Sequence, residues 1–380
     1  RVQKLVQSAF AGKPKDIISQ SVAKALYGEV SPYSATRLER FAACAFAHFL
    51  QYGMKLTERV EYEFKPMDMG NVMHEALESF AEEVRKRGMK WTELTEQERN
   101  EIADRCLDNI VADYGNTVLK SSARNEYMIE RTRRILRRTV WALQKQLEQG
   151  EFQPEGFEVT FGGGRIDRVD IMEDQNKVYV KVIDYKTGNT SFDLVYLYHG
   201  LQLQLMIYLD GALRVEQKKY PDKEIIPAGV FYYNIKDPMI QEKIDADVEA
   251  VSAGLMKELK MNGLVQADPE LVYRMDSSLG SIPVAFNKDG SFRKNSSVAD
   301  RTQFAVLGRY VRTKIEKIRS SILEGDAEVS PYELGKKNAC TYCPYMTVCG
   351  FDRRLSGYEF RRLKNFSDEE LWKAFDREAE

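Results

Sequence analysis

The sequence predicts an α/β fold, in which helices flank a central β-sheet. Apolar residues recur at helical spacing over much of residues 34–149, and the pattern changes to alternating and β-branched residues between 158 and 184. A further helix and a buried-looking strand follow within residues 194–235. Helices, a β-meander, another helix and another strand in this order are typical of one α/β core rather than of separate helical and β units.

The length and composition are those of an ordinary globular protein. The chain has 380 residues, enough to bury a substantial core as one large domain or as two to three smaller ones. The formal net charge is only −2, so any binding of nucleic acid has to be local. One candidate surface is a run of arginines on a predicted helix, for which a solvated helix face is an equally good interpretation: Arg131, Arg133, Arg134, Arg137 and Arg138.

Four helices are expected in the first part of the chain. Ser34 is suited to cap the first of them, which carries Cys44. The second is expected over residues 70–87, where apolar residues recur at helical spacing up to a glycine. The third and fourth are expected over residues 95–114 and 121–149.

Three strands are expected next, because short alternating or β-branched runs are separated by turn residues. These strands cover residues 158–161, 165–172 and 177–184. Beyond them we expect a helix over 194–217, a strand over 228–235 and a long helix over 301–324, whereas residues 241–300 show no clear pattern.

Two carboxylates and a lysine are placed by this meander at one position. Asp184 and Lys186 project to the same face of their strand, and Asp167 lies on the preceding strand. Converging carboxylates repel each other unless a divalent cation binds between them, and oxygen ligands suit Mg2+ or Mn2+. The metal then activates water and polarises a phosphoryl oxygen, while the lysine orients the water or offsets developing charge. The pattern predicts a metal-dependent phosphodiesterase site.

A surface Asp and Lys closing a hairpin would produce the same short motif, which is common by itself. The residues before it, among them Val180 and Val182, bury the strand, so the charged pair lies at the end of a sheet, where sites in α/β proteins usually lie. Asp170 is three residues from Asp167 and should face the opposite side, so we interpret it as structural.

Three further residues are candidates for the same site. His74 is on a predicted helix and is either a metal ligand or a partly buried helical histidine. Gln204 and Tyr208 are four residues apart and share one helix face. Both can contact a phosphate or the lysine, although a core tyrosine with a glutamine at its edge is an equally good interpretation.

Three cysteines close to one another indicate a second metal centre. Cys340, Cys343 and Cys349 need a fourth ligand, and the only well-placed thiol is Cys44, roughly 300 residues upstream. Four thiolates suit either Zn2+ or an iron–sulfur cluster. A zinc site in which His48 replaces one thiolate is a further possibility. Either group would close a very long loop and so restrict the unfolded chain, and we expect loss of a cysteine to impair folding more than chemistry.

Taken in order, these motifs resemble the RecB-type branch of the PD-(D/E)xK nucleases and, within it, the nuclease domains of AddB-type helicase/deoxyribonuclease subunits. The resemblance runs from about residue 30 to 355. Its motifs are Gly70-x3-His74-x2-Leu77-Glu78, Gly164-Arg-Ile-Asp167, Ile183-Asp-Tyr-Lys186-Thr-Gly188, Gln204-x3-Tyr208, and Cys44 with Cys340-x2-Cys343-x5-Cys349.

This resemblance implies a restriction-endonuclease-like core, with a central mixed β-sheet flanked by helices, helical insertions, and a 4Fe–4S clasp joining the two ends. The cluster ligands would be Cys44, Cys340, Cys343 and Cys349. The Mg2+ or Mn2+ ligands would be His74, Asp167, Asp184 and the main-chain carbonyl of Tyr185. The catalytic set would be Asp167, Asp184, Lys186, Gln204 and Tyr208.

The resemblance also implies an activity and a partner. The family pairs with an AddA-type helicase/nuclease subunit and processes broken DNA ends for recombination. This chain would be the Mg2+-dependent exonuclease that degrades the 5′-ended single strand. A stand-alone Cas4-like iron–sulfur exonuclease and a non-catalytic DNA-end-binding module are the alternatives, and two converging carboxylates without a metal would not favour binding of anionic DNA.

The expected organisation follows from the same resemblance. Residues 1–30 would be the tail of an absent helicase-like region, and residues 31–380 the nuclease domain. Its expected parts are a helical part over 31–150, a catalytic core over 151–240, an insertion and helix over 241–330, and a cysteine segment over 331–355. We find no Gly-x4-Gly-Lys-Ser/Thr phosphate loop, no leader and no long apolar segment, so we expect a cytoplasmic chain without a membrane partner.

Overall fold

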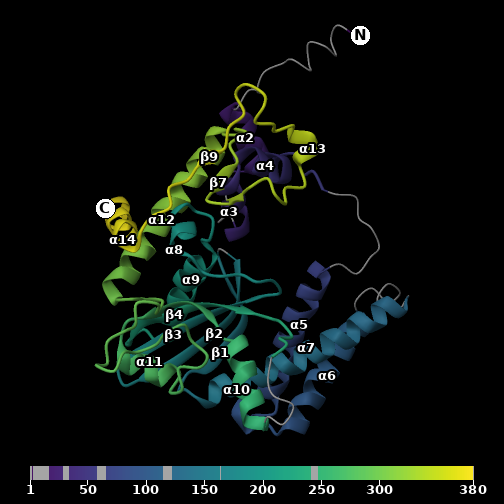
Figure 1. Ribbon diagram of the computed structural model, residues 1–380, viewed down its shortest axis with the longest axis vertical. Coiled ribbons are helices and arrows are strands. Elements are labelled where there is room, and N and C mark those ends of the chain that lie inside the picture. Colours follow the sequence, from purple (N-terminus) through teal and green to yellow (C-terminus); the bar gives the residue numbers. More distant parts are fainter. Residues whose placement is uncertain are drawn as a thin grey trace.

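The computed structural model (Figure 1) describes residue 2 and residues 17–28, 34–57, 66–113, 122–162, 164–240 and 247–379. The part of the chain that these ranges cover contains no helix long and apolar enough to cross a bilayer. Most of residues 1–30, including the expected N-terminal tail, lie outside the described residues.

A six-stranded mixed sheet forms the centre of the molecule, with its strands in the order β1-β2-β3-β4-β5-β6. The strands are β1 Gln153–Phe161, β2 Gly164–Asp174, β3 Lys177–Lys186, β4 Glu224–Asn234, β5 Asn262–Gln266 and β6 Val298–Ala299. The first three strands are antiparallel neighbours, which is the expected meander. β3 then pairs in parallel with β4, so the connection between them crosses over through helices on one face of the sheet.

Helices cover both faces of this sheet (Figure 1). One layer contains α5 Pro66–Lys86, α6 Glu96–Asp113 and α7 Ala123–Glu148, with α10 Val248–Glu258 and α11 Pro269–Met275 nearby. The other layer contains α3 Ala35–Ala43, α9 Gln204–Lys219, α12 Arg301–Glu324 and α14 Asp368–Ala379, with α2 Gln20–Tyr27 and α8 Leu194–Tyr198. The predicted α/β class and the mixed sheet flanked by helices are therefore confirmed.

The side chains of β3 alternate between the two layers. Val180 and Val182 pack in the core with α9, whereas Tyr179 and Tyr185 pack in the core with α5 to α7. Because the period is two residues, the side chains of the last residues of β3 are distributed to the two faces in the same way. The alternation determines which layer of helices meets the charged end of the strand.

The end of the chain forms a small second sheet, with the strand order β8-β7-β9, beside the N-terminal helices (Figure 1). Its elements are β7 Tyr332–Leu334, β8 Lys337–Asn338, α13 Met346–Cys349 and β9 Arg361–Arg362. They lie against α3, α4 Ala45–His48 and the π-helix η1 Phe49–Gly53. A backbone hydrogen bond of 2.9 Å from Phe46 to the carbonyl of Glu328 joins these segments.

Most expected elements are present, with one clear correction. The helix predicted over 301–324 is confirmed at both ends, with Asp300 as its N-cap and Gly325 as its C-cap. The helix predicted over 194–217 is wrong, because it is divided into α8 and α9. The interruption contains Gly200, whose φ of +77° is incompatible with a continuing right-handed helix. The break matters because it creates a second helix N-terminus beside the sheet.

Candidate active site

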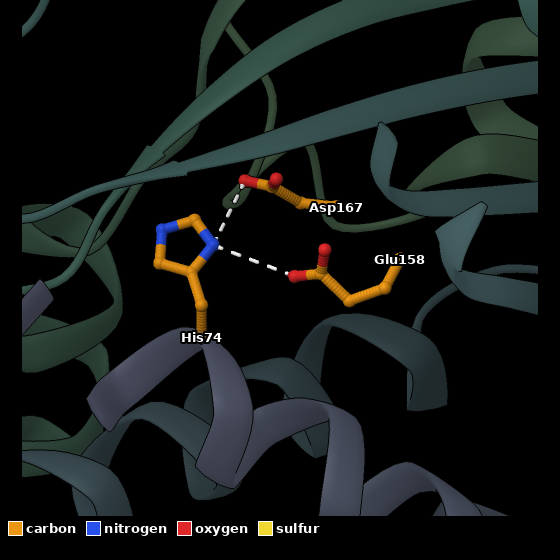
Figure 2. A group of neighbouring side chains, drawn as sticks. All are labelled: His74, Glu158 and Asp167. Carbon is orange, nitrogen blue, oxygen red and sulfur yellow. Dashed lines mark ion pairs between the residues drawn. The ribbon is translucent and has the colours of Figure 1, made fainter. Parts of the chain in front are cut away.

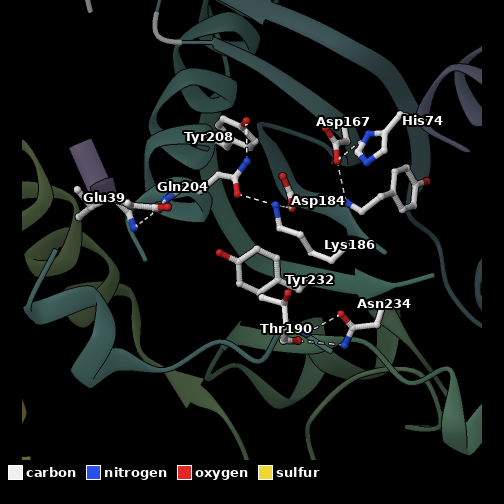
Figure 3. Close-up of polar contacts among 12 residues, drawn as sticks. Glu39, His74, Asp167, Asp184, Lys186, Thr190, Gln204, Tyr208, Tyr232 and Asn234 are labelled. Atoms are coloured by element: carbon white, nitrogen blue, oxygen red, sulfur yellow. Dashed lines mark hydrogen bonds and ion pairs between the residues drawn. The ribbon is translucent and has the colours of Figure 1, made fainter. Parts of the chain in front are cut away.

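A cavity of about 890 Å3 opens where β2 and β3 meet α5 and α9. It is lined by all seven residues that the sequence predicted for the site: His74, Asp167, Asp184, Tyr185, Lys186, Gln204 and Tyr208. Figure 3 shows the His74, Asp167, Asp184 and Lys186 side chains gathered at one place, although they come from a helix and two strands. The structure thus brings the predicted set together, and their roles remain predictions.

The two carboxylates lie where the ladder between β2 and β3 ends. The pairing reaches Arg168 opposite Ile183, one position before Asp167 and Asp184. Beyond that pair, the backbone N–H of Tyr185 donates to Asp167 Oδ2 at 2.7 Å instead of to a strand neighbour. Both aspartates are buried, so they are held close to each other with little water to screen them.

His74 reaches the carboxylates from α5, and it approaches a second acidic residue as well (Figure 2). Its Nδ1 atom lies 3.4 Å from Asp167 Oδ2 and 3.6 Å from Glu158 Oε1. Within the described ranges, these three residues are the one group of three or more whose possible ligand atoms all lie within 4.8 Å of one another. Nitrogen and carboxylate oxygen ligands in this arrangement suit a divalent cation.

Glu158 is a site residue that the sequence analysis missed. It lies on β1 between the pairs Phe157–Arg168 and Val159–Ile166, and so opposite Asp167. Its φ is +50°, a conformation that costs free energy for a residue with a side chain. The available signal was an acidic residue inside an expected strand, followed by Asp167 on the next strand of a hairpin.

Lys186 is held by three neighbours. Its Nζ lies 2.6 Å from Asp184 Oδ2 and donates to Gln204 Oε1 at 2.7 Å. The ring of Tyr232 on β4 lies 5.4 Å from the same nitrogen, close enough for a cation–π contact. Gln204 Nε2 in turn donates to the Tyr208 hydroxyl at 2.9 Å, so the glutamine links the lysine to the tyrosine (Figure 3).

Glu39 is the second residue that the sequence analysis missed. Its Oε1 accepts hydrogen bonds from the backbone N–H groups of Leu203 and Gln204, at 2.7 and 2.9 Å. Burial raises the pKa of Glu39 to about 7, although those hydrogen bonds and Lys186 act in the opposite direction. No local pattern indicates the contact, because 164 residues separate Glu39 from Leu203.

The electrostatics of the site favour a cation. Burial and the Asp167 carboxylate raise the pKa of Asp184 to about 7, against the effect of Lys186. Burial alone would lower the pKa of His74, but Asp167 and Glu158 raise it to about 10. Both shifts arise because several carboxylates share a buried space. A divalent cation bound there would relieve their repulsion.

Asp170 lies on the other face of the sheet, as its interpretation as a structural residue requires. The Arg168 guanidinium donates to its two oxygens at 2.6 and 2.9 Å, and Lys181 Nζ lies 3.0 Å away. Although burial opposes ionisation, these two cations lower the pKa of Asp170. The three charges therefore form a buried network that supports the sheet beneath the cavity.

The cysteine side chains meet at a separate place. Cys44, Cys340, Cys343 and Cys349 line one small cavity of about 10 Å3, together with apolar residues. Burial raises the pKa of Cys44, Cys340 and Cys349, that of Cys340 to about 12, and the neighbouring thiols act in the same direction. Free thiolates are thus disfavoured in this cavity, and a metal would be needed to neutralise them.

His48 is not placed to complete that set. Its buried ring lies 5.2 to 5.5 Å from the rings of Tyr27, Phe41 and Tyr52. Its Nε2 accepts a hydrogen bond of 3.2 Å from Arg37, and burial together with Arg37 lowers its pKa to about 3. The residue is a neutral core histidine, so the structure does not favour a zinc site of three thiolates and His48.

The run of arginines on α7 is mostly paired with acidic residues. Arg137 forms a charge pair with Asp104, and Arg134 Nε lies 2.6 Å from Asp237. Arg133 Nη2 lies 2.7 Å from Asp108. These pairs neutralise much of the local charge, so the solvated helix face is the better interpretation and a path for DNA is not favoured here.

Comparisons with known proteins bear on this geometry. A sequence model described as the PD-(D/E)XK nuclease superfamily matches residues 32–350. Relatives named as AddB-type subunits of an ATP-dependent helicase/deoxyribonuclease match from Lachnoclostridium phytofermentans, with 42% identity over 100% of this chain and 34% of the relative, and from Thermoanaerobacter sp. strain X514, with 34% identity over 100% and 35%. A third, from Clostridium acetobutylicum, is 35% identical over 96% of this chain and 33% of its own length. The chain spans about a third of the length of these relatives, and the resemblance expected from the motifs is confirmed.

Proposed function

Because the chain belongs to the PD-(D/E)XK nuclease superfamily, we propose that it is the Mg2+-dependent DNA exonuclease domain of an AddAB-type helicase–nuclease. The observation that carries this proposal is the convergence of His74, Asp167 and Asp184, with Lys186 beside them, on one cavity of about 890 Å3. The cavity is wide enough to admit a nucleotide, and its charged groups come from rigid elements of the core.

The residues present fit a divalent cation. His74, Asp167, Asp184 and the carbonyl of Tyr185 would hold it, and the raised pKa values of His74 and Asp184 reflect the concentrated negative charge. When bound, the metal supplies polarisation of a phosphoryl oxygen and a lowered pKa for an attacking water. The hydrogen bond from the Tyr185 N–H to Asp167 Oδ2 fixes the orientation of that carboxylate, and Glu158 lies close enough to hold His74.

Lys186 acts on the reacting phosphate in this proposal. Its ammonium group is turned toward Asp184 by Gln204, so it lies at the position where a water or a phosphoryl oxygen meets the metal ligands. A fixed positive charge there stabilises the charge that develops in the transition state. Gln204 and Tyr208 keep the amine in place rather than taking part in the bond-breaking step.

We assign a 4Fe–4S cluster to the four cysteines, as the resemblance implies. Three thiolates around one tetrahedral zinc ion would lie about 3.8 Å apart, and in the described part of the chain no three of these sulfur atoms fall within 4.8 Å of one another. That spacing favours a larger group. The free volume of about 10 Å3 suits a single ion better, so a cluster requires side chains such as the partly exposed Met346 to move outward. We give more weight to the spacing, because it follows from the backbone positions of the ligands.

The substrate and partner follow from the relatives. Their name describes one subunit of an ATP-dependent helicase/deoxyribonuclease, so a motor protein of the AddA type is the proposed partner. The proposed substrate is the 5′-ended single strand that the motor unwinds at a broken end in the cytoplasm. Residues outside this chain would supply the remaining two-thirds of the protein.

A nuclease assay tests the proposal. The purified chain should degrade single-stranded DNA with Mg2+, should lose this activity in EDTA, and should lose it as Asp184→Ala. Asp222→Ala, which changes an exposed carboxylate in the turn before β4, is the matched control and should keep full activity. Equal binding of DNA ends by wild type and Asp184→Ala, with no cleavage by either, would favour the non-catalytic binding module. Product lengths and 5′- versus 3′-labelled substrates would separate exonuclease from endonuclease activity and establish polarity.

A further inference from the structure

The start of α9 is capped by a residue from a distant helix. Leu203, the N-cap residue, has an apolar side chain that cannot accept a hydrogen bond from the first turn. The carboxylate of Glu39 on α3 accepts those hydrogen bonds instead, from the N–H groups of Leu203 and Gln204 at 2.7 and 2.9 Å. A negative charge at this position also matches the partial positive charge of a helix N-terminus.

The same helix start carries the glutamine that holds the lysine. Gln204 Oε1 accepts from Lys186 Nζ at 2.7 Å, and Lys186 Nζ lies 2.6 Å from Asp184. One residue therefore has its backbone held by Glu39 and its side chain bound to the lysine (Figure 3). A shift of the first turn of α9 would move the amide oxygen away from Lys186.

We propose that Glu39 is a positioning residue for Lys186: its carboxylate sets the start of α9, and thereby holds Gln204 where it directs the lysine amine to Asp184. The inference rests on the proposed nuclease function and deepens it. Glu39 does not touch the metal ligands through a hydrogen bond; it acts through the backbone of Gln204.

The placement of α3 supports this role. The residues at its start, Ser34 and Thr36, line the active cavity, whereas its C-cap residue, Cys44, lines the cysteine cavity. Arg40, next to Glu39, donates to Cys343 Sγ at 3.8 Å and lies over the ring of Tyr345. The helix is thus anchored at its far end, and Glu39 projects from a supported element rather than from a loop.

Changes in Glu39 should lower turnover without weakening binding. We expect Glu39→Ala to lower kcat about 10- to 100-fold, as loss of orienting contacts around a site typically does. KM for single-stranded DNA and the affinity for Ca2+, used as a non-catalytic probe of the metal site, should stay within about twofold of wild type. Glu39→Gln keeps an oxygen acceptor and should retain most of the activity, whereas Glu39→Asp is too short to reach both N–H groups and should give an intermediate kcat.

A double-mutant cycle with Gln204 identifies the route of the effect. Gln204→Ala should lower kcat by itself, and adding Glu39→Ala to it should lower kcat little further, because both changes break one chain of contacts. Multiplicative effects in the double variant would overturn the inference, as would a parallel loss of Ca2+ affinity in Glu39→Ala. If Glu39→Ala does not fold, the cycle is run with Glu39→Asp, whose wild-type kcat would equally overturn it.

The wild-type chain separates this inference from the function on which it rests. Absence of Mg2+-dependent cleavage by the wild type would refute the nuclease proposal, and with it the role of Lys186. Cleavage by the wild type together with an unaltered kcat in Glu39→Ala would refute the role of Glu39 alone.

Discussion

The active cavity and the cysteine cavity lie at the two ends of α3 and differ in almost every physical respect. The first has a volume of about 890 Å3 and is lined by charged and polar side chains. The second has a volume of about 10 Å3 and is lined by thiols and apolar groups. The first takes its metal ligands from residues 74–185, whereas the second joins residue 44 to residues 340–349.

This difference separates chemistry from architecture. Repulsion among buried carboxylates costs folding free energy that only a bound cation returns, which is typical of a site selected for reactivity. The thiols instead connect the two ends of the described chain, whose docking also uses protein contacts such as the 3.0 Å hydrogen bond from the Tyr345 hydroxyl to the carbonyl of Leu56. Damage to the two regions should therefore have different consequences.

The largest expected effect is on stability, from loss of a cysteine. Cys349→Ala should destabilise the chain by about 5 kcal/mol, if a cross-link that closes a loop of roughly 300 residues acts as in the chain-entropy account. Thermal unfolding and limited proteolysis measure the change. An unchanged melting temperature and unchanged protease resistance would refute the clasp. The buried Cys106, outside the cavity, provides the control, and Cys106→Ala should leave the iron content unaltered.

Iron content sharpens the same comparison. The wild-type chain should be brown and contain four iron atoms per chain if the cluster is 4Fe–4S, and Cys349→Ala should be colourless. One zinc atom per chain and no visible absorbance would establish the alternative metal.

The next largest effect is on activity, from loss of an active-site carboxylate. Asp184→Asn should lower kcat about 1,000-fold or more, because it removes a metal ligand and the partner of Lys186. Its iron content should equal that of the wild type, since the cysteine cavity is a separate site. Stopped cleavage assays and metal analysis of one preparation measure both. Loss of iron in Asp184→Asn would contradict the independence of the two regions.

A smaller effect is expected at Glu158. Glu158→Gln should weaken Mg2+ binding about 10- to 100-fold, while kcat at saturating Mg2+ stays near that of wild type. The reason is that its carboxylate lies 3.6 Å from His74 Nδ1 and raises the pKa of that ring. Titration of activity against Mg2+ measures the shift. Glu155→Gln, nearby on β1 but outside the cavity lining, is the matched control, and an equal Mg2+ requirement in both variants would exclude Glu158 from the metal site.

The smallest effect is the pH dependence of stability. In the metal-free chain, the stabilisation from a pKa of about 10 at His74 is complete below pH 6.5 and is lost as the pH rises toward 10. The stabilisation from the raised pKa of Asp184 is lost as the pH rises through about 7. The melting temperature should therefore fall between pH 6.5 and 8.5, and Mg2+ should raise it by a few degrees more at the higher pH, where protons no longer compete. An equal Mg2+ effect at both pH values would contradict this assignment.

Local patterns in the sequence were sufficient for the elements and for part of the site. The strand containing Asp184 and Lys186 was predictable because its apolar residues alternate, and alternation determines the face of every side chain in a strand. The helix Arg301–Glu324 was predictable because its cap residues and its periodicity are local. The pairing of Gln204 with Tyr208 follows from their helical spacing in the same way.

Tertiary structure alone decided the contacts that complete the site. The sequence by itself determined which residues carry the chemistry: Asp167, Asp184 and Lys186 follow from strand periodicity, which acts over a few residues. The contacts of Glu158 with His74 and of Glu39 with α9 join segments 84 and 164 residues apart, and no short-range pattern encodes them. The neutralisation of the α7 arginines and the neutral state of His48 likewise depend on neighbours that only packing brings close. Periodicity fixes directions along one element, whereas charge pairing and capping depend on distances between elements.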